Sequence, residues 1–209
     1  MLTGPSLSIT DKGAPLYESK CHLEVTVEDV ITFIENNMDH VTNRCFAMTF
    51  LYVLGQSGSL EAKPTLPEVE FIQAEHRAIY KQSKKEQFLS DNLRTKFNVN
   101  EYLTPVFKFK NADEFIEVAK QAVGFHLSYP NTFMLSLGNK RDHHVMAVSV
   151  ETSADKPPRY TVFDSAKFAI QGENLNEILK IAISNHPRYY TVQGVFFQPY
   201  SSFKGICRH

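Results

Sequence analysis

The chain has 209 residues, 43% of them hydrophobic, and a formal net charge of −1. This length favours one substantial domain over two small ones, and the apolar content is that of a folded protein rather than a disordered one. Basic and acidic residues are mixed along the sequence, without the basic clusters that bind nucleic acid or an anionic membrane surface. We therefore expect a globular protein with no nucleic-acid partner.

The first 20 residues are rich in Gly, Pro and Ser and lack periodicity, which predicts a mobile arm over residues 1–20 and a single domain over residues 21–209. They have neither the charged start nor the long apolar core of a secretory signal peptide. No later apolar stretch is long enough to span a bilayer, so we expect a soluble protein with no integral membrane segment.

The cysteines are Cys21, Cys45 and Cys207. Their odd number and wide spacing argue against a disulfide framework and favour a reducing compartment, although a Cys21–Cys207 bridge is an alternative. No pair of them has the spacing of zinc ligands.

The first two thirds of the chain have mainly helical patterns. Residues 21–28 alternate in polarity as a short strand does, and residues 104–110 alternate as an extended segment. Periodicity predicts helices over residues 27–38, 45–55, 68–97 and 111–124. In the last of these, Asn111 caps the start and Gly124 ends the helix.

The last third changes to strands. Alternation and turn signals predict strands over residues 131–138, 143–151, 159–164 and 188–200. One helix, over residues 172–185, is inserted before the last strand. Helices followed by a mostly antiparallel sheet make the fold class α+β.

Cys45 begins an apolar helix, in the stretch NRCFAMTFL. A lone cysteine on an apolar helix is most often a small hydrophobic residue of the core. Here Thr42 and Asn43, residue types that cap helix starts, precede it, so Cys45 falls in the first turn, where the helix dipole stabilises a thiolate. The position indicates a nucleophile if the chain also supplies a base.

Two histidines begin the strand HHVMAVSVE, and alternation points them to opposite faces. We favour His144 as the base because its face carries the larger apolar side chains, and His143 is the alternative. The next strand, RYTVFD, ends in Asp164. In an antiparallel hairpin Asp164 lies beside His144 and can orient its imidazole, although it could instead cap the turn that follows.

The other histidines show no metal-ligand spacing, so we expect no metal site and no cofactor. They are His22, His40, His76, His126, His186 and His209.

The three motifs NRCFAMTFL, HHVMAVSV and YTVFDSAKF occur in the order of papain-like cysteine proteases, and they most resemble the YopT-like family of bacterial effector proteases. The resemblance implies a papain-like fold, with the nucleophile helix in an N-terminal helical part and the His and Asp on a C-terminal sheet. It implies Cys45 as nucleophile, His144 as general base and Asp164 as its orienting partner. It also implies a protein substrate, in a host cell that the protein enters through a specialised secretion system.

The sequence departs from this family in two places. Ser165 and Ala166 follow the Asp, where family members often have Pro and Asn. The oxyanion glutamine of papain-like enzymes is absent, and Asn43 is our first candidate to replace it, before His40 and Asn37. The same motifs fit a glutamine deamidase or a transglutaminase-like enzyme. A non-catalytic interaction module, in contrast, predicts a buried, unreactive cysteine.

Overall fold

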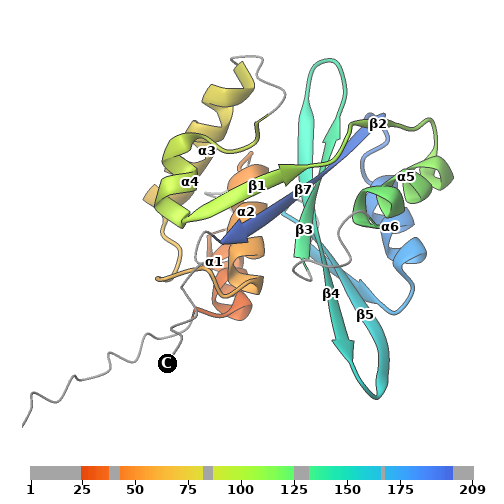
Figure 1. The fold of residues 1–209 in the computed structure, drawn as a ribbon, viewed down its shortest axis with the longest axis horizontal. Coiled ribbons are helices and arrows are strands. Elements are labelled where there is room, and N and C mark those ends of the chain that lie inside the picture. The colour runs from red at the N-terminus through yellow and green to blue at the C-terminus, as the bar shows by residue number, and fades with distance from the viewer. Residues whose placement is uncertain (1–24, 38–42, 82–86, 125–131, 166–167, 200–209) are drawn as a thin grey trace, which may run out of the picture.

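A seven-stranded antiparallel sheet lies between two groups of helices in the computed structural model, which describes residues 25–37, 43–81, 87–124, 132–165 and 168–199 (Figure 1). The helices are α1 (Val27–Asn36), α2 (Cys45–Gln56), α3 (Leu66–Lys81), α4 (Asp91–Phe97), α5 (Ala112–Gly124) and α6 (Leu175–Ser184). The strands are β1 (Val99–Leu103), β2 (Phe107–Lys108), β3 (Thr132–Gly138), β4 (His143–Ser153), β5 (Lys156–Asp164), β6 (Phe168–Gly172) and β7 (Thr191–Pro199).

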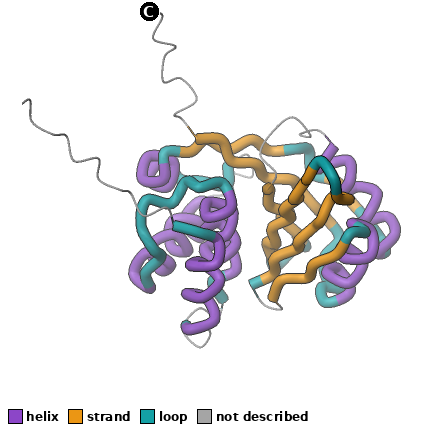
Figure 2. Tube along the Cα trace, turned by 90° about the horizontal axis from the view of Figure 1, so that it is seen from below, coloured by secondary structure: helices purple, strands orange, loops and turns teal. Residues whose placement is uncertain are grey.

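The strand order is β1-β7-β3-β4-β5-β6, with β2 paired to β7 outside this path. Figure 2 shows the layers from below, with helices on both sides of the strands. The helices α1 to α4 lie on one side of the sheet and α5 and α6 on the other (Figure 1). The predicted class, helices combined with an antiparallel sheet, is confirmed.

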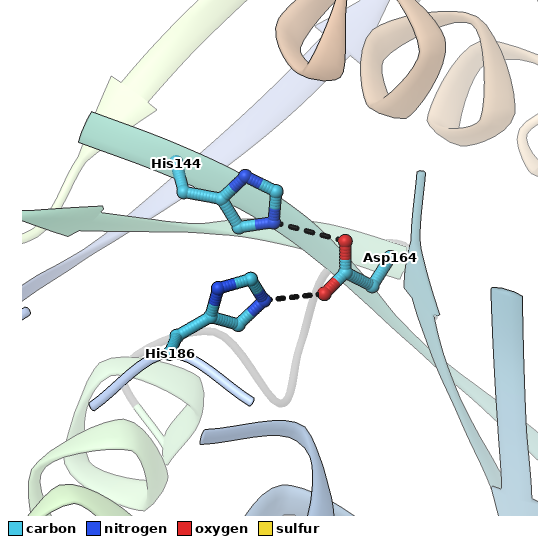
Figure 3. A group of neighbouring side chains, drawn as sticks. All are labelled: His144, Asp164 and His186. Atoms are coloured by element: carbon cyan, nitrogen blue, oxygen red, sulfur yellow. Dashed lines mark hydrogen bonds and ion pairs between the residues drawn. The ribbon is translucent and has the colours of Figure 1, made fainter. Parts of the chain in front are cut away.

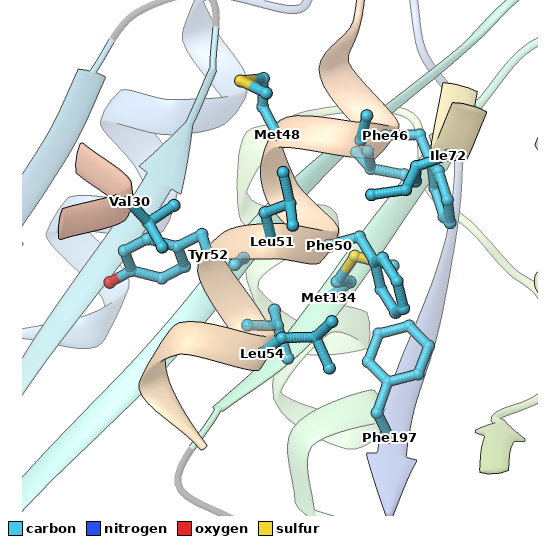
Figure 4. Packing of buried hydrophobic residues seen from close by; sticks show 14 of the residues in the cluster. Val30, Phe46, Met48, Phe50, Leu51, Tyr52, Leu54, Ile72, Met134 and Phe197 are labelled. Atoms are coloured by element: carbon cyan, nitrogen blue, oxygen red, sulfur yellow. The ribbon is translucent and has the colours of Figure 1, made fainter. Parts of the chain in front are cut away.

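Helix α2 is the centre of the larger core, and every residue from Phe46 to Gly55 is buried (Figure 4). It is apolar around its whole circumference because it contacts α1, α3 and the sheet. Thr49 Oγ1 donates to the carbonyl of Val145 at 3.3 Å, and the ring of Tyr52 stacks on Phe163 with 4.3 Å between centroids. The first contact fixes α2 on β4, and the second fixes it on β5.

The alternation of β4 divides its side chains between two cores. Val145 and Ala147 belong to the core around α2, whereas Met146 and Val148 pack in a second core beneath α5 and α6. This is the period-two pattern of a strand that is buried on both faces.

The first helix was predicted and begins at Val27 as expected, but the strand predicted just before it is wrong in its described part. Residues 25–28 are not a strand, because Thr26 caps α1: its side chain accepts a hydrogen bond from the amide of Asp29, whose carboxylate bonds back to the Thr26 amide. This capping box starts the helix at Val27 and overrides the local alternation.

The helix predicted over residues 68–97 is two helices, α3 and α4. Ser90 starts the second by accepting from the amide of Leu93 at 3.1 Å. Strands β1 and β6 were not predicted. Strand β1 pairs with β7, which is distant in sequence, and β6 pairs with β5 across a hairpin. The Asn111 cap is present, since its Oδ1 accepts from the Glu114 amide at 2.9 Å.

Several predictions fall outside the described residues. These are the arm over residues 1–20, the Cys21–Cys207 alternative, and the histidines His22, His40, His126 and His209. None of the helices within the described ranges is long and apolar enough to cross a membrane.

Candidate active site

Cys45 is the first residue of α2, a half-buried free thiol. The prediction that Asn43 caps this helix is wrong. The capping position is Arg44, whose side chain makes no capping hydrogen bond, and Asn43 is exposed with a φ of 63°. Asparagine tolerates this left-handed conformation better than most residues, so its role here is to turn the chain into the helix. Thr42 lies outside the described residues.

Helix α3 holds the start of α2 in place. The Arg77 guanidinium donates to the carbonyl of Asn43 at 3.2 Å, and Arg44 forms an ion pair with Glu70 at 2.6 Å. The buried Gln73 accepts from the amide of Ala47 at 3.3 Å and satisfies one of the N–H groups that a helix start leaves unpaired. The backbone around the thiol is therefore fixed by three side chains of a neighbouring helix.

His144 and Asp164 are in contact, as the hairpin geometry predicted. His144 Nε2 lies 2.9 Å from Asp164 Oδ1 (Figure 3). The pairing of Ala147 with Phe163 sets the register of β4 and β5 that brings the two together. His144 is 7% exposed and Asp164 only 1%, so the pair is largely withdrawn from water.

The Cys45 thiol also influences His144, because it helps to raise the pKa of the imidazole. Burial lowers the pKa of His144, but hydrogen bonds with Asp164 and Cys45, together with the charges of both, outweigh burial and raise it to about 9. The imidazole is therefore protonated at neutral pH. Because Nε2 is bonded to Asp164, the other ring nitrogen, Nδ1, is the one that remains for Cys45.

A third side chain that sequence reasoning missed, His186, completes this group. Its Nε2 lies 2.6 Å from Asp164 Oδ2, and its ring lies 4.3 Å from that of His144 (Figure 3). It follows α6 by two residues, in the turn before β7. No local pattern marks this position, because the contact depends on the packing of α6 against β5.

The group His144, Asp164 and His186 also has ligand atoms close enough to hold a metal ion, which spacing along the sequence did not reveal. Its geometry, however, is that of hydrogen bonds. The nitrogen–oxygen distances are 2.9 and 2.6 Å, whereas two ligands of one tetrahedral Zn²⁺ lie about 3.3 Å apart. The two histidines also use different oxygens of the carboxylate. The group is therefore a shared carboxylate with two imidazole donors.

The alternative base, His143, belongs to a second and separate histidine pair. Its Nε2 lies 2.8 Å from Nε2 of His76 on α3, and its ring stacks on Tyr80. His76 Nδ1 lies 3.2 Å from the Phe88 carbonyl, which can only accept, so Nδ1 carries the His76 proton. Burial, and then the charge of His143, lower the pKa of His76 to about 3, and burial also lowers the pKa of His143. This pair is therefore neutral.

A pocket of about 590 Å³ opens beside the neutral pair. Its wall carries large apolar side chains that are exposed to solvent. Tyr80 is 52% exposed, Val106 58% and Tyr190 38%. Lys140 is the one charged side chain in the part of the wall that the structure describes. His143 lines this pocket, whereas Cys45, His144 and Asp164 are not among its described lining residues.

The three oxyanion candidates are placed differently. Asn43 is two residues before Cys45 and is exposed. Asn37 Nδ2 donates to the carbonyl of Phe33 at 2.8 Å, so one of its donors serves its own helix. His40 lies outside the described residues.

No protein-family model matches the chain, and no curated protein is similar to it in sequence. Among solved structures, the Pseudomonas avirulence protein AvrPphB is similar to it with a TM-score of 0.43 and 13% identity, over 83% of this chain and 94% of that chain.

Proposed function

We propose that the protein is a cysteine hydrolase in which Cys45 is the nucleophile, His144 the general base and Asp164 the residue that orients His144. The observation that carries this proposal is a buried imidazole that bonds to a carboxylate and whose pKa is raised partly by a thiol at a helix start. This is the arrangement that an activated nucleophile requires: a base within reach, and a third group that orients the base.

The chemistry follows from the charge of His144. Its imidazolium pairs with the Cys45 thiolate, which attacks a carbonyl carbon and forms a carbon–sulfur bond. Amide groups at the start of α2, with Asn43 as the side-chain candidate, stabilise the oxyanion. His144 then gives its proton to the leaving amine, takes one from water, and the resulting hydroxide cleaves the thioester.

We further propose a peptide bond in a protein as the substrate, and residues 21–209 as one papain-like catalytic domain. The order of the three motifs supports both, and the pocket beside His143 gives room for a side chain of a substrate. The resemblance to effector proteases extends the proposal to export from a bacterium and to a host protein as the target.

Mass spectrometry of a eukaryotic cell proteome treated with the wild type or with Cys45→Ala tests this function. Peptide-bond hydrolysis produces new N-termini that the variant does not produce. A deamidase would instead add about one mass unit to glutamine, and a transglutaminase would add the mass of an amine. Identical proteomes after treatment with the wild type and with the variant would support a non-catalytic module and contradict the proposal.

A further inference from the structure

Both oxygens of the Asp164 carboxylate are bonded to imidazole nitrogens. Oδ1 accepts from His144 Nε2 at 2.9 Å, and Oδ2 accepts from His186 Nε2 at 2.6 Å (Figure 3). A carboxylate next to a protonated imidazole is ionised and can only accept, so Nε2 of His186 carries a proton. The two donors come from different parts of the fold, one from the start of β4 and the other from the turn after α6.

The second donor restricts the orientation of the carboxylate. The terminal torsion of an aspartate is broad, and a hydrogen bond to each oxygen limits the rotation of the carboxylate plane. Asp164 is 1% exposed, and bulk water has little access to replace a lost donor. The short, charge-assisted bond to Oδ2 fixes the plane and thereby the direction of Oδ1.

His186 is itself held rigidly. Its amide donates to the carbonyl of Ile183 at 2.8 Å, and its own carbonyl accepts from the amide of Tyr189 at 3.3 Å. Its side chain is 11% exposed and its ring lies against that of His144. The backbone turn therefore aims the ring at Oδ2.

We infer that His186 is a positioning residue of the proposed active site, which holds Asp164 so that Oδ1 stays directed at Nε2 of His144. The inference rests on the proposed function, because His186 acts only through Asp164 and His144. The donor atom of His186 is Nε2. A residue that replaces His186 in this role must therefore place an N–H group at the same distance from Cβ.

Two substitutions that introduce neutral amide side chains distinguish this positioning role from a role in general packing. The amide nitrogen of glutamine lies three bonds from Cβ, as Nε2 of histidine does, whereas that of asparagine lies two bonds from Cβ, as Nδ1 does. His186→Gln can therefore donate to Oδ2, and His186→Asn falls short. The measurement is the alkylation rate of Cys45 by iodoacetamide at about pH 6.5, with peptide mapping, and His144→Ala as the reference.

We expect His186→Gln to react within about twofold of the wild type, and His186→Asn to react about tenfold more slowly, approaching His144→Ala. Once a cleaved substrate is identified, the same loss should appear in kcat with KM unchanged. Circular dichroism checks folding. If His186→Asn does not fold, His186→Ser, which is also too short, replaces it.

Three results would overturn the inference, and they are distinguishable. If His144→Ala slows alkylation but the Asn variant does not, the proposed function stands and His186 has no positioning role. If His144→Ala leaves alkylation unchanged, the proposed function is wrong, and the role of His186 fails with it. Equal losses in the Gln and Asn variants would point to packing and also overturn the inference.

Discussion

His143 and His144 are consecutive residues of β4 whose side chains have different hydrogen-bond partners, one on a helix and one on the neighbouring strand. His143 Nε2 lies 2.8 Å from Nε2 of His76 on α3, and His144 Nε2 lies 2.9 Å from Asp164 on β5. The first pair has lowered pKa values and is neutral, whereas the pKa of His144 is raised to about 9. One strand therefore carries a structural and a charged histidine side by side, and this difference can be tested.

Removing His144 should slow the alkylation of Cys45 near neutral pH, because the thiolate loses the imidazolium that stabilises it. We expect His144→Ala to react about tenfold or more slowly with iodoacetamide at about pH 6.5. The wild type should lose this advantage as the pH rises through about 9, where His144 loses its proton. Peptide mapping separates Cys45 from the other two cysteines.

His143→Ala is the matched control for this experiment. It leaves Nε2 of the buried His76 without its partner and should lower the free energy of unfolding by about 1–3 kcal/mol. The alkylation rate of Cys45 should stay within about twofold of the wild type. A control variant that slows alkylation as much as His144→Ala would move the base from His144 to His143.

Asp164→Asn should damage both the stability and the activity of the protein. The carboxylate accepts from two imidazoles, whereas the amide has one oxygen and turns an NH₂ group towards one donor. We expect a loss of about 1–3 kcal/mol in the free energy of unfolding and a decrease of about a hundredfold or more in turnover. Urea denaturation and the cleavage assay measure the two effects, and turnover at the wild-type level would remove Asp164 from the mechanism.

His76 should make the folded protein sensitive to acid. Its pKa is about 3 in the folded state and about 6.5 when unfolded, so below pH 6.5 the unfolded chain binds a proton that the folded chain does not. This contribution to stability is fully present above pH 6.5 and is lost as the pH falls through about 3. We expect a stability difference of several kcal/mol over this interval.

His76→Phe tests the acid dependence by denaturant melts at several pH values. Phenylalanine keeps the ring that stacks on Phe46, 3.7 Å away between centroids, but cannot bind a proton. The variant should lose stability more gently than the wild type below pH 6.5. Parallel pH profiles for the two proteins would mean that another group causes the acid dependence.

The two possible roles of Asn43 can be tested separately: its left-handed backbone conformation, and its side-chain amide as a donor to the oxyanion. Its φ of 63° suits glycine, so Asn43→Gly removes the amide without strain, whereas Asn43→Ala should cost about 1 kcal/mol of stability. If the amide stabilises the oxyanion, both variants should lose turnover by about a hundredfold, with the glycine variant as stable as the wild type. Full turnover in Asn43→Gly would leave the oxyanion to backbone amides.

The sequence was informative where local physics decides structure. The apolar run after His144, bounded by turn signals, marked a strand, and Asn111 marked a helix start. Hairpin connectivity alone placed Asp164 beside His144, because a short turn between antiparallel strands fixes which ends meet. Local signals misled at Thr26 and Asn43, where a capping box and a left-handed residue replaced the expected strand and helix cap.

The sequence by itself therefore determined the α+β class and two neighbouring site residues, since these follow from periodicity and from connections of a few residues. Only the tertiary structure decided the rest: that Cys45 lies where it can raise the pKa of His144, that His186 shares Asp164, and that His143 pairs with His76. These contacts join residues 22 to 99 positions apart. Their geometry is set by the packing of whole helices against the sheet, which no local pattern encodes.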